Sequence, residues 1–337
     1  MARFRTSPRR RAWPIAIVDS VSGYIAAGCL HLVRRFDRHK MANLLGPLAR
    51  RVGPFLPEHR VGRANLKAAF PDKSPDEIET ILGGVWDNLG RVVADFAHLD
   101  RLRVYDPDQP GPSDIEYSEE TRARFHAIRK SNKPALLFAA HLANWEIPPL
   151  VAHRYGIDTT VLYRRPNLPG IADAVVDMRA GCMGTLLPGG LDAPFKMANA
   201  LEHGNMVGML VDQHDTRGVV VQFFGQHANT SPLLARLARQ VDCPIYGTRI
   251  VRLPNNRFRI ELTDAIAPVR DADGLIDVAA TMQAVTDVVE RWVREYPEQW
   301  LWLHRRWRSN KGSWKTRRQA RRARLIARSA ARQPSSR

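Results

Sequence analysis

The chain has 337 residues, of which 44% are hydrophobic and 25% are charged, an ordinary composition for a globular protein that can bury a substantial core. Its formal net charge of +17 predicts an anionic partner, which could be a nucleic acid, an acidic protein or an anionic membrane. The three cysteines lie far apart without CxxC spacing, which argues against a zinc site and against a disulfide framework.

The basic charge is concentrated at the two ends of the chain. Arginines crowd the first eleven residues, and residues 305–337 contain many basic residues but no acidic one. A mostly apolar stretch runs from Trp13 to Val33, but Asp19 interrupts it, and a charged side chain is costly inside a bilayer. We therefore expect residues 1–40 to form a basic N-terminus and a membrane-associating helix. This helix either lies in the interface or spans the bilayer with its N-terminal flank in the cytoplasm.

Residues 41–102 are predicted to be helical. Leu44, Leu45, Leu48 and Val52 follow helical spacing, and Ser74 is a plausible helix cap. The proline- and aspartate-rich residues 105–112 are predicted to form a loop.

From Thr121 onward, helical and strand patterns alternate. We expect strands at 135–140, 159–163, 183–187, 206–211, 219–223, 245–251 and 258–262, and helices at 122–130, 148–155, 170–180, 193–202, 232–240 and 278–295. The alternation predicts an α/β fold, with a central, mostly parallel sheet that has helices on both faces and follows a helical N-terminal region. We assign residues 41–310 to this domain and residues 311–337 to a basic tail that is either an exposed helix or disordered.

Polar side chains follow three of the predicted strands. The first strand is followed by His141 and Glu146. The next strands deliver Tyr163, Arg164 and Arg165, and then Asp212, Gln213, His214 and Asp215. Because the carboxyl ends of parallel strands share one edge, where ligands bind in open α/β sheets, we expect these groups to converge on one cleft. Taken singly, each could instead be a solvated loop residue.

A histidine beside a carboxylate can take a proton from a hydroxyl, because the carboxylate fixes the tautomer and stabilises the imidazolium. We predict that His141 is a general base and that Glu146 orients it. A structural histidine is the alternative, and so is a metal site that adds His214 and Asp215, although no HExxH pattern is present.

Several motifs that are absent from the sequence argue against particular types of reaction. No GxSxG elbow is present, which argues against a covalent acyl-enzyme, and no GxGxxG or P-loop is present, which argues against nucleotide chemistry. Arg164 or Arg165 could hold a phosphate or stabilise an oxyanion, unless they form surface salt bridges. We expect direct transfer without a cofactor or metal, in which a deprotonated hydroxyl attacks an activated acyl group.

The stretch from His141 to Glu146 fits the HxxxxE form of the HxxxxD/E signature of the lysophospholipid acyltransferase-like superfamily. Within it, the chain resembles the lipid A biosynthesis acyltransferase family of secondary lauroyl/myristoyl-type acyltransferases. The matching segments keep the family's order and spacing over roughly residues 15–308. They are residues 63–66, 70–71, 141–146, 163–167, 212–213, 223–225, 228–230, 297–300 and 304–307.

The resemblance implies an acyl carrier protein as the acyl donor and a hydroxyacyl chain on a phosphorylated glucosamine disaccharide as the acceptor. It implies attachment to the cytoplasmic face of the inner membrane, with His141 as the base and Glu146 as its partner. The residues expected to bind substrate are Arg164, Asp212, Tyr163, Asn144, Arg165 and Gln213. Family members often read Asp-Gln-Asp, whereas this chain has His214 at the third position and Asp215 next to it.

Three other functions are alternatives to the acylation of a lipid A precursor. The acceptor could be another lipid, such as a lysophospholipid or an ornithine lipid. A metal-dependent hydrolase is a more remote possibility and would lose its activity on chelation. We do not expect nucleic-acid binding, because the basic tail beyond Trp314 has no aromatic residues on which bases could stack.

Overall fold

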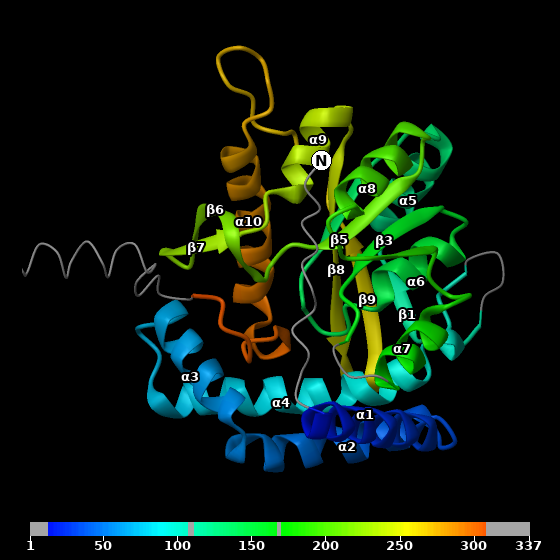
Figure 1. The fold of residues 1–337 in the computed structure, drawn as a ribbon, viewed down its shortest axis with the longest axis vertical. Helices are drawn as coiled ribbons and strands as arrows, with labels where there is room; N and C mark the ends of the chain where they lie inside the picture. The colour runs from blue at the N-terminus through cyan, green and yellow to red at the C-terminus, as the bar shows by residue number, and fades with distance from the viewer. Residues whose placement is uncertain (1–12, 107–110, 167–169, 308–337) are drawn as a thin grey trace, which may run out of the picture.

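The computed structural model describes residues 13–106, 111–166 and 170–307, arranged as a helical layer beneath an α/β sheet (Figure 1). The arginines of residues 1–12 and the basic tail predicted at 311–337 lie outside the described residues.

The helical layer is built from the N-terminal part of the chain. Its elements are α1 (Trp13–Val33), α2 (Arg38–Val52), the 3-10 turn η1 (Gly53–Phe55), α3 (Pro57–Ala69) and α4 (Pro75–Ala97). The cap predicted at Ser74 is confirmed as a capping box, in which Ser74 and Glu77 each accept a hydrogen bond from the other's backbone N–H. The helices α2 and α4 pack closely, since a Cβ atom at Gly90 would lie 2.2 Å from the carbonyl oxygen of Leu45.

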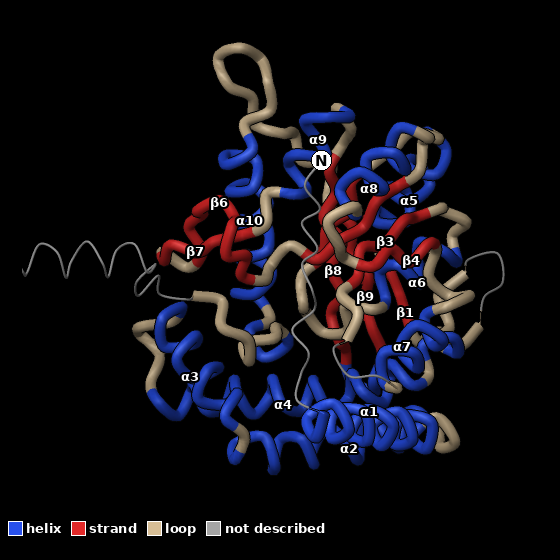
Figure 2. The backbone as a smooth tube through the Cα atoms, viewed as in Figure 1, coloured by secondary structure: helices blue, strands red, loops and turns tan. Residues whose placement is uncertain are grey.

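None of the described helices is long and apolar enough to cross a bilayer. Both α1 and α2 pack against α4, at the lower end of the molecule in Figures 1 and 2.

The remaining elements alternate between helix and strand. In chain order they are η2 (Leu99–Arg101), β1 (Ile115–Tyr117), α5 (Glu119–Ser131), β2 (Leu136–Ala139), α6 (Ile147–Arg154), β3 (Thr159–Tyr163), α7 (Ile171–Arg179), β4 (Thr185–Pro188), α8 (Ala193–Glu202), β5 (Met206–Leu210), β6 (His214–Phe223), β7 (Gln226–Thr230), α9 (Leu233–Val241), β8 (Ile245–Leu253), η3 (Pro254–Asn256), β9 (Arg257–Leu262), α10 (Val278–Glu295) and η4 (Pro297–Gln299).

The predicted central, mostly parallel sheet is confirmed. Its strand order is β1-β9-β8-β2-β5-β3-β4, in which β8, β2, β5, β3 and β4 run parallel and β9 runs antiparallel to β8. The strand predicted at 219–223 belongs to β6, which pairs with β7 in a separate two-stranded sheet. The pattern missed β7 because its sequence, Gln-His-Ala-Asn-Thr, has no apolar run, and it missed β1 because that strand has only three residues.

The sheet is buried on both faces. Leu136 and Phe138 of β2 pack in a core with residues of α8, α9 and α10, whereas Leu137 packs in a second core with residues of α5 and α6. Burial on both faces explains why β2 is a continuous apolar run.

The C-terminal segment joins the helical layer to the loop that follows β2. Leu142 and Trp300 form an antiparallel bridge, and the backbone N–H of Leu301 donates to the carbonyl of His141 at 3.0 Å. Asn88 of α4 donates its side-chain N–H to the carbonyl of Ala143 at 3.1 Å. The loop carrying His141 is therefore held from two sides.

Candidate active site

His141 and Asp212 meet at the carboxyl edge of the sheet. The strands β2 and β5 are neighbours with Ala139 opposite Leu210, and each site residue lies two positions beyond its strand end. The two side chains therefore leave the sheet at the same level, and His141 Nδ1 lies 2.7 Å from Asp212 Oδ1. The backbone N–H of His141 donates to Asp212 Oδ2 at 2.8 Å, which fixes the carboxylate against the loop.

These contacts define the tautomer of His141. An ionised carboxylate can only accept hydrogen bonds, so the Nδ1 atom of His141 must carry the proton and donate to Asp212. The Nε2 atom is then left with a free lone pair. The side-chain amide of Gln213 lies 3.1 Å from Nε2 and must donate to it through an N–H. The amide of Gln213 therefore covers the Nε2 atom of His141.

Asp212 is buried and ionised. Burial by itself would raise the pKa of Asp212, but the adjacent His141 and its hydrogen bonds hold this pKa well below the usual range for aspartate. The indole N–H of Trp300 donates to Asp212 Oδ2 at 2.7 Å, so both carboxylate oxygens have partners. A buried carboxylate in this position can stabilise an imidazolium.

Two further groups lie near the pair. The ring of His304 lies 6.4 Å from that of His141, and burial lowers the pKa of His304. Arg306 is almost fully buried, and burial lowers its pKa to about 10, which leaves it protonated at neutral pH. Arg306 therefore supplies a buried positive charge that interacts with the buried carboxylate of Asp212.

The predicted contact between Glu146 and His141 is wrong in this structure. Both oxygens of Glu146 accept from Arg179 at the end of α7, Oε2 from Nε at 2.8 Å and Oε1 from Nη2 at 2.5 Å. The loop does not continue as a helix from His141, because Ala143 has a φ of 47° and α6 begins only at Ile147. Glu146 consequently reaches α7, and Asp212 takes the position predicted for it.

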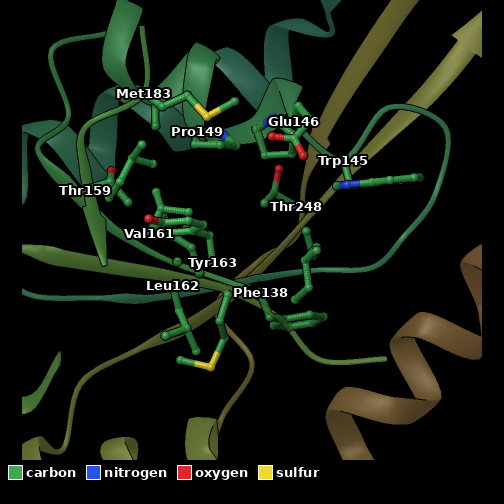
Figure 3. Close-up of a pocket in the computed structure, with 18 of the residues that line it drawn as sticks. Phe138, Trp145, Glu146, Pro149, Thr159, Val161, Leu162, Tyr163, Met183 and Thr248 are labelled. Carbon is green, nitrogen blue, oxygen red and sulfur yellow. The ribbon is translucent and has the colours of Figure 1, made fainter. Parts of the chain in front are cut away.

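An apolar cavity of about 710 Å³ is lined by His141 and by residues of α6, β2, β3 and β5. Figure 3 shows this cavity in close-up. In Figure 3, Met183 and Pro149 lie along one side of this cavity, opposite Val161. The cavity lining follows β3 from Thr159 to Tyr163, a depth of about 13 Å at the usual rise of a strand. Gly208 and Ala139 contribute to its wall and leave room because their side chains are absent or small.

The other predicted substrate-binding residues fall in different places. Tyr163, Arg164 and Gln213 line the cavity. Arg165 is exposed and pairs with Asp173 at 2.6 Å, and Asn144 is fully buried, where its Oδ1 accepts from the backbone N–H of Glu146.

His214, which stands at the position of the expected acid, begins β6 and pairs there with Thr230. The next residue, Asp215, accepts a hydrogen bond from the backbone N–H of Arg217. Within the described part of the chain, no group of three or more His, Cys, Asp and Glu side chains is placed to hold a metal ion.

The sequence interpretation missed two contributions to the site. Arg179 lies at the end of α7 outside any recognisable motif, and only the need of a buried Glu146 for a counter-charge could have suggested it. Trp300 lies in the matching segment 297–300, but its indole contact with Asp212 joins residues that are far apart in the sequence.

The fold and site define an α/β protein with a histidine–aspartate pair at the sheet edge and an apolar cavity beside the base. The model of the bacterial lipid A biosynthesis acyltransferase family matches residues 11–309. The chain therefore belongs to this family and is an acyltransferase of lipid A biosynthesis, as the sequence resemblance predicted. No curated protein matches the chain.

Proposed function

We propose that the protein moves a fatty acyl chain from an acyl carrier protein thioester to the hydroxyl of a hydroxyacyl chain on a phosphorylated lipid A precursor. The observation that carries this proposal is that His141, whose Nδ1 atom faces Asp212, lines an apolar cavity of about 710 Å³. Such a cavity can hold the hydrocarbon chain of the donor, with its thioester beside the base.

In the proposed reaction, His141 Nε2 takes the proton of the acceptor hydroxyl while the hydroxyl oxygen attacks the thioester carbonyl carbon. The tetrahedral intermediate then expels the thiolate as the carbon–sulfur bond breaks. The imidazolium returns its proton to that thiolate, so the products are the ester and the free carrier thiol. The ionised carboxylate of Asp212 stabilises the imidazolium between the two transfers.

Arg179 is positioned to stabilise the developing oxyanion. It contributes to the cavity wall, and its Nη1 atom is buried without a hydrogen-bond partner among the described residues. A preorganised cationic donor of this kind is worth most where water is excluded. Glu146 holds the guanidinium through two hydrogen bonds, so we assign Glu146 a positioning role through Arg179.

Charge supports the proposed partners. Acyl carrier proteins are acidic and the acceptor carries phosphates, so a chain of net charge +17 would attract both. Arg164 is exposed at the cavity and is available to bind a phosphate. The same charge favours the anionic cytoplasmic face of the inner membrane, where the acceptor is embedded.

The test is to incubate the purified protein with acyl carrier protein thioesters of several chain lengths and a tetra-acylated lipid A precursor, and to weigh the lipid product. We expect the mass of one acyl group to be added. A parallel reaction offers a lysophospholipid and an ornithine lipid as acceptors. No acyl gain by the lipid A precursor with any donor, or faster acylation of the other lipids, would refute the proposed acceptor.

A further inference from the structure

The exposed face of α2 carries a row of large apolar side chains. Leu44, Leu48 and Val52 follow each other at intervals of four residues, and 56%, 50% and 47% of their surfaces are exposed. Phe55, in the turn η1 that continues the helix, is 87% exposed. Side chains four residues apart lie on the same face of a helix, so these groups form one strip.

The strip lies on the side of α2 that faces away from α4. The opposite face of α2 packs against α4, and Ala42 and Gly46 are buried there. The packing is tight, because a Cβ atom at Gly46 would lie 2.9 Å from Asp87 Oδ1. A contiguous apolar strip that the fold does not cover marks an interaction surface.

The charged side chains beside the strip indicate which kind of partner it binds. The helix α2 contains Lys40, Arg50 and Arg51 but no acidic residue, and helical geometry places Lys40 next to Leu44 and Arg51 next to Leu48. None of these three cations forms an ion pair with another residue of the described structure. Apolar side chains flanked by free cations are typical of helices that lie in the surface of an anionic bilayer.

A second helix that packs on α4, α1, also exposes apolar side chains. Among the described side chains of α1, Tyr24, Ile25 and Leu32 are more than half exposed. Both α1 and α2 pack against α4, and all three helices lie at the lower end of the molecule in Figure 2.

We infer that α2 and η1, together with the exposed residues of α1, dock in the plane of an anionic lipid bilayer. This inference extends the proposed function, because it names the surface through which the enzyme reaches an embedded acceptor.

Docking through α2 would bring the catalytic edge close to the lipid. The helix α4 connects α2 to the loop of His141, since α2 packs against α4 and Asn88 on α4 donates to the carbonyl of Ala143. Packed helices lie about 8–10 Å apart, so this single layer sets a short and fixed distance from the surface to the site.

The test measures co-sedimentation of the full chain with vesicles of phosphatidylglycerol or of phosphatidylcholine, without substrate. The variant Leu44→Ser/Leu48→Ser/Val52→Ser should bind phosphatidylglycerol vesicles roughly 100-fold more weakly than wild type, since each half-exposed apolar side chain contributes on the order of a factor of five. Lys40→Gln/Arg51→Gln, which keeps the apolar strip, should reduce both the preference for the anionic lipid and the salt dependence of binding, while the basic termini keep part of each.

The control is Val220→Ser/Leu275→Ser, which removes two apolar side chains with exposures of 59% and 48% that lie outside the helical layer. It should bind like wild type, and thermal unfolding should show that all variants are folded. Wild-type affinity in the triple variant, an equal loss in the control, or equal wild-type binding to both lipids would overturn the inference. Because no acyl donor is present, the binding result is independent of whether acyl transfer is found.

Discussion

The reactivity of His141 is set by its immediate neighbours. Asp212 fixes the proton on Nδ1, and Trp300 and the backbone N–H of His141 hold Asp212 in place. The base lone pair on Nε2 faces the amide of Gln213, which occupies the position that a substrate hydroxyl would need. Substrate must therefore displace this amide before a proton can move.

Gln213→Met tests the role of this amide, because methionine has a similar size but no N–H donor. Without the amide, water can reach Nε2 and attack a bound thioester. We expect hydrolysis of the acyl carrier protein thioester, measured as free thiol in the absence of acceptor, to rise relative to acyl transfer. An unchanged ratio of hydrolysis to transfer would show that the amide does not guard the base.

The pair of Glu146 and Arg179 is suited to a double-mutant cycle. Its side chains are only 9% and 14% exposed, so removing one partner leaves the other charge poorly compensated. We expect Glu146→Gln and Arg179→Met each to lower the free energy of unfolding, and the double variant to lose about 1–3 kcal/mol less than the sum of both. Additive losses in denaturant unfolding would mean that the two groups act independently.

At the scale of elements, the strands β2 and β5 position the site residues because the two strands are neighbours in the sheet and end at the same level. The positions of both strands and the polar residues that follow them were predictable, because each strand is a bounded apolar run. The pairing of His141 with Asp212 was not predictable, since it depends on β5 being inserted between β2 and β3. Sequence proximity favoured Glu146, but the turn at Ala143 directs that residue to α7.

Gly208 on β5 tests whether the cavity holds the acyl chain. It lies opposite Leu137 on β2 and Val161 on β3, and a Cβ atom there would make only ordinary contacts, the nearest at 3.6 Å from Thr159. We expect Gly208→Ala to lower kcat/KM for the longest donors slightly and Gly208→Leu to lower it strongly, with short donors nearly unaffected. Equal losses for short and long donors would argue against the cavity as the acyl site.

Across the whole molecule, a buried charge network ties the helical layer to the sheet. Asp95 on α4 is fully buried between Arg38 of α2 at 3.0 Å and Arg252 of β8 at 2.8 Å. Arg38 also contacts Asp114 at 2.6 Å. The network holds the predicted membrane-facing helices and the catalytic edge in one fixed arrangement.

Asp95→Asn should lower the free energy of unfolding by about 3–5 kcal/mol, because it leaves two buried guanidinium groups without their shared counter-charge. The matched control is Asp173→Asn, which breaks the exposed pair with Arg165 and should cost less than about 1 kcal/mol. Denaturant unfolding of both variants provides the measurement. Similar small losses in the two variants would show that the buried network contributes little.

The central claim is that His141 acts as a base held by Asp212. Its most direct test is the initial rate of acyl transfer to a lipid A precursor by wild type and Asp212→Asn, with His141→Ala as the lower limit. We predict that Asp212→Asn lowers the rate by roughly 10³–10⁴-fold, because the asparagine no longer fixes the tautomer or stabilises the imidazolium. A folded Asp212→Asn protein that transfers acyl groups at close to the wild-type rate would contradict the account.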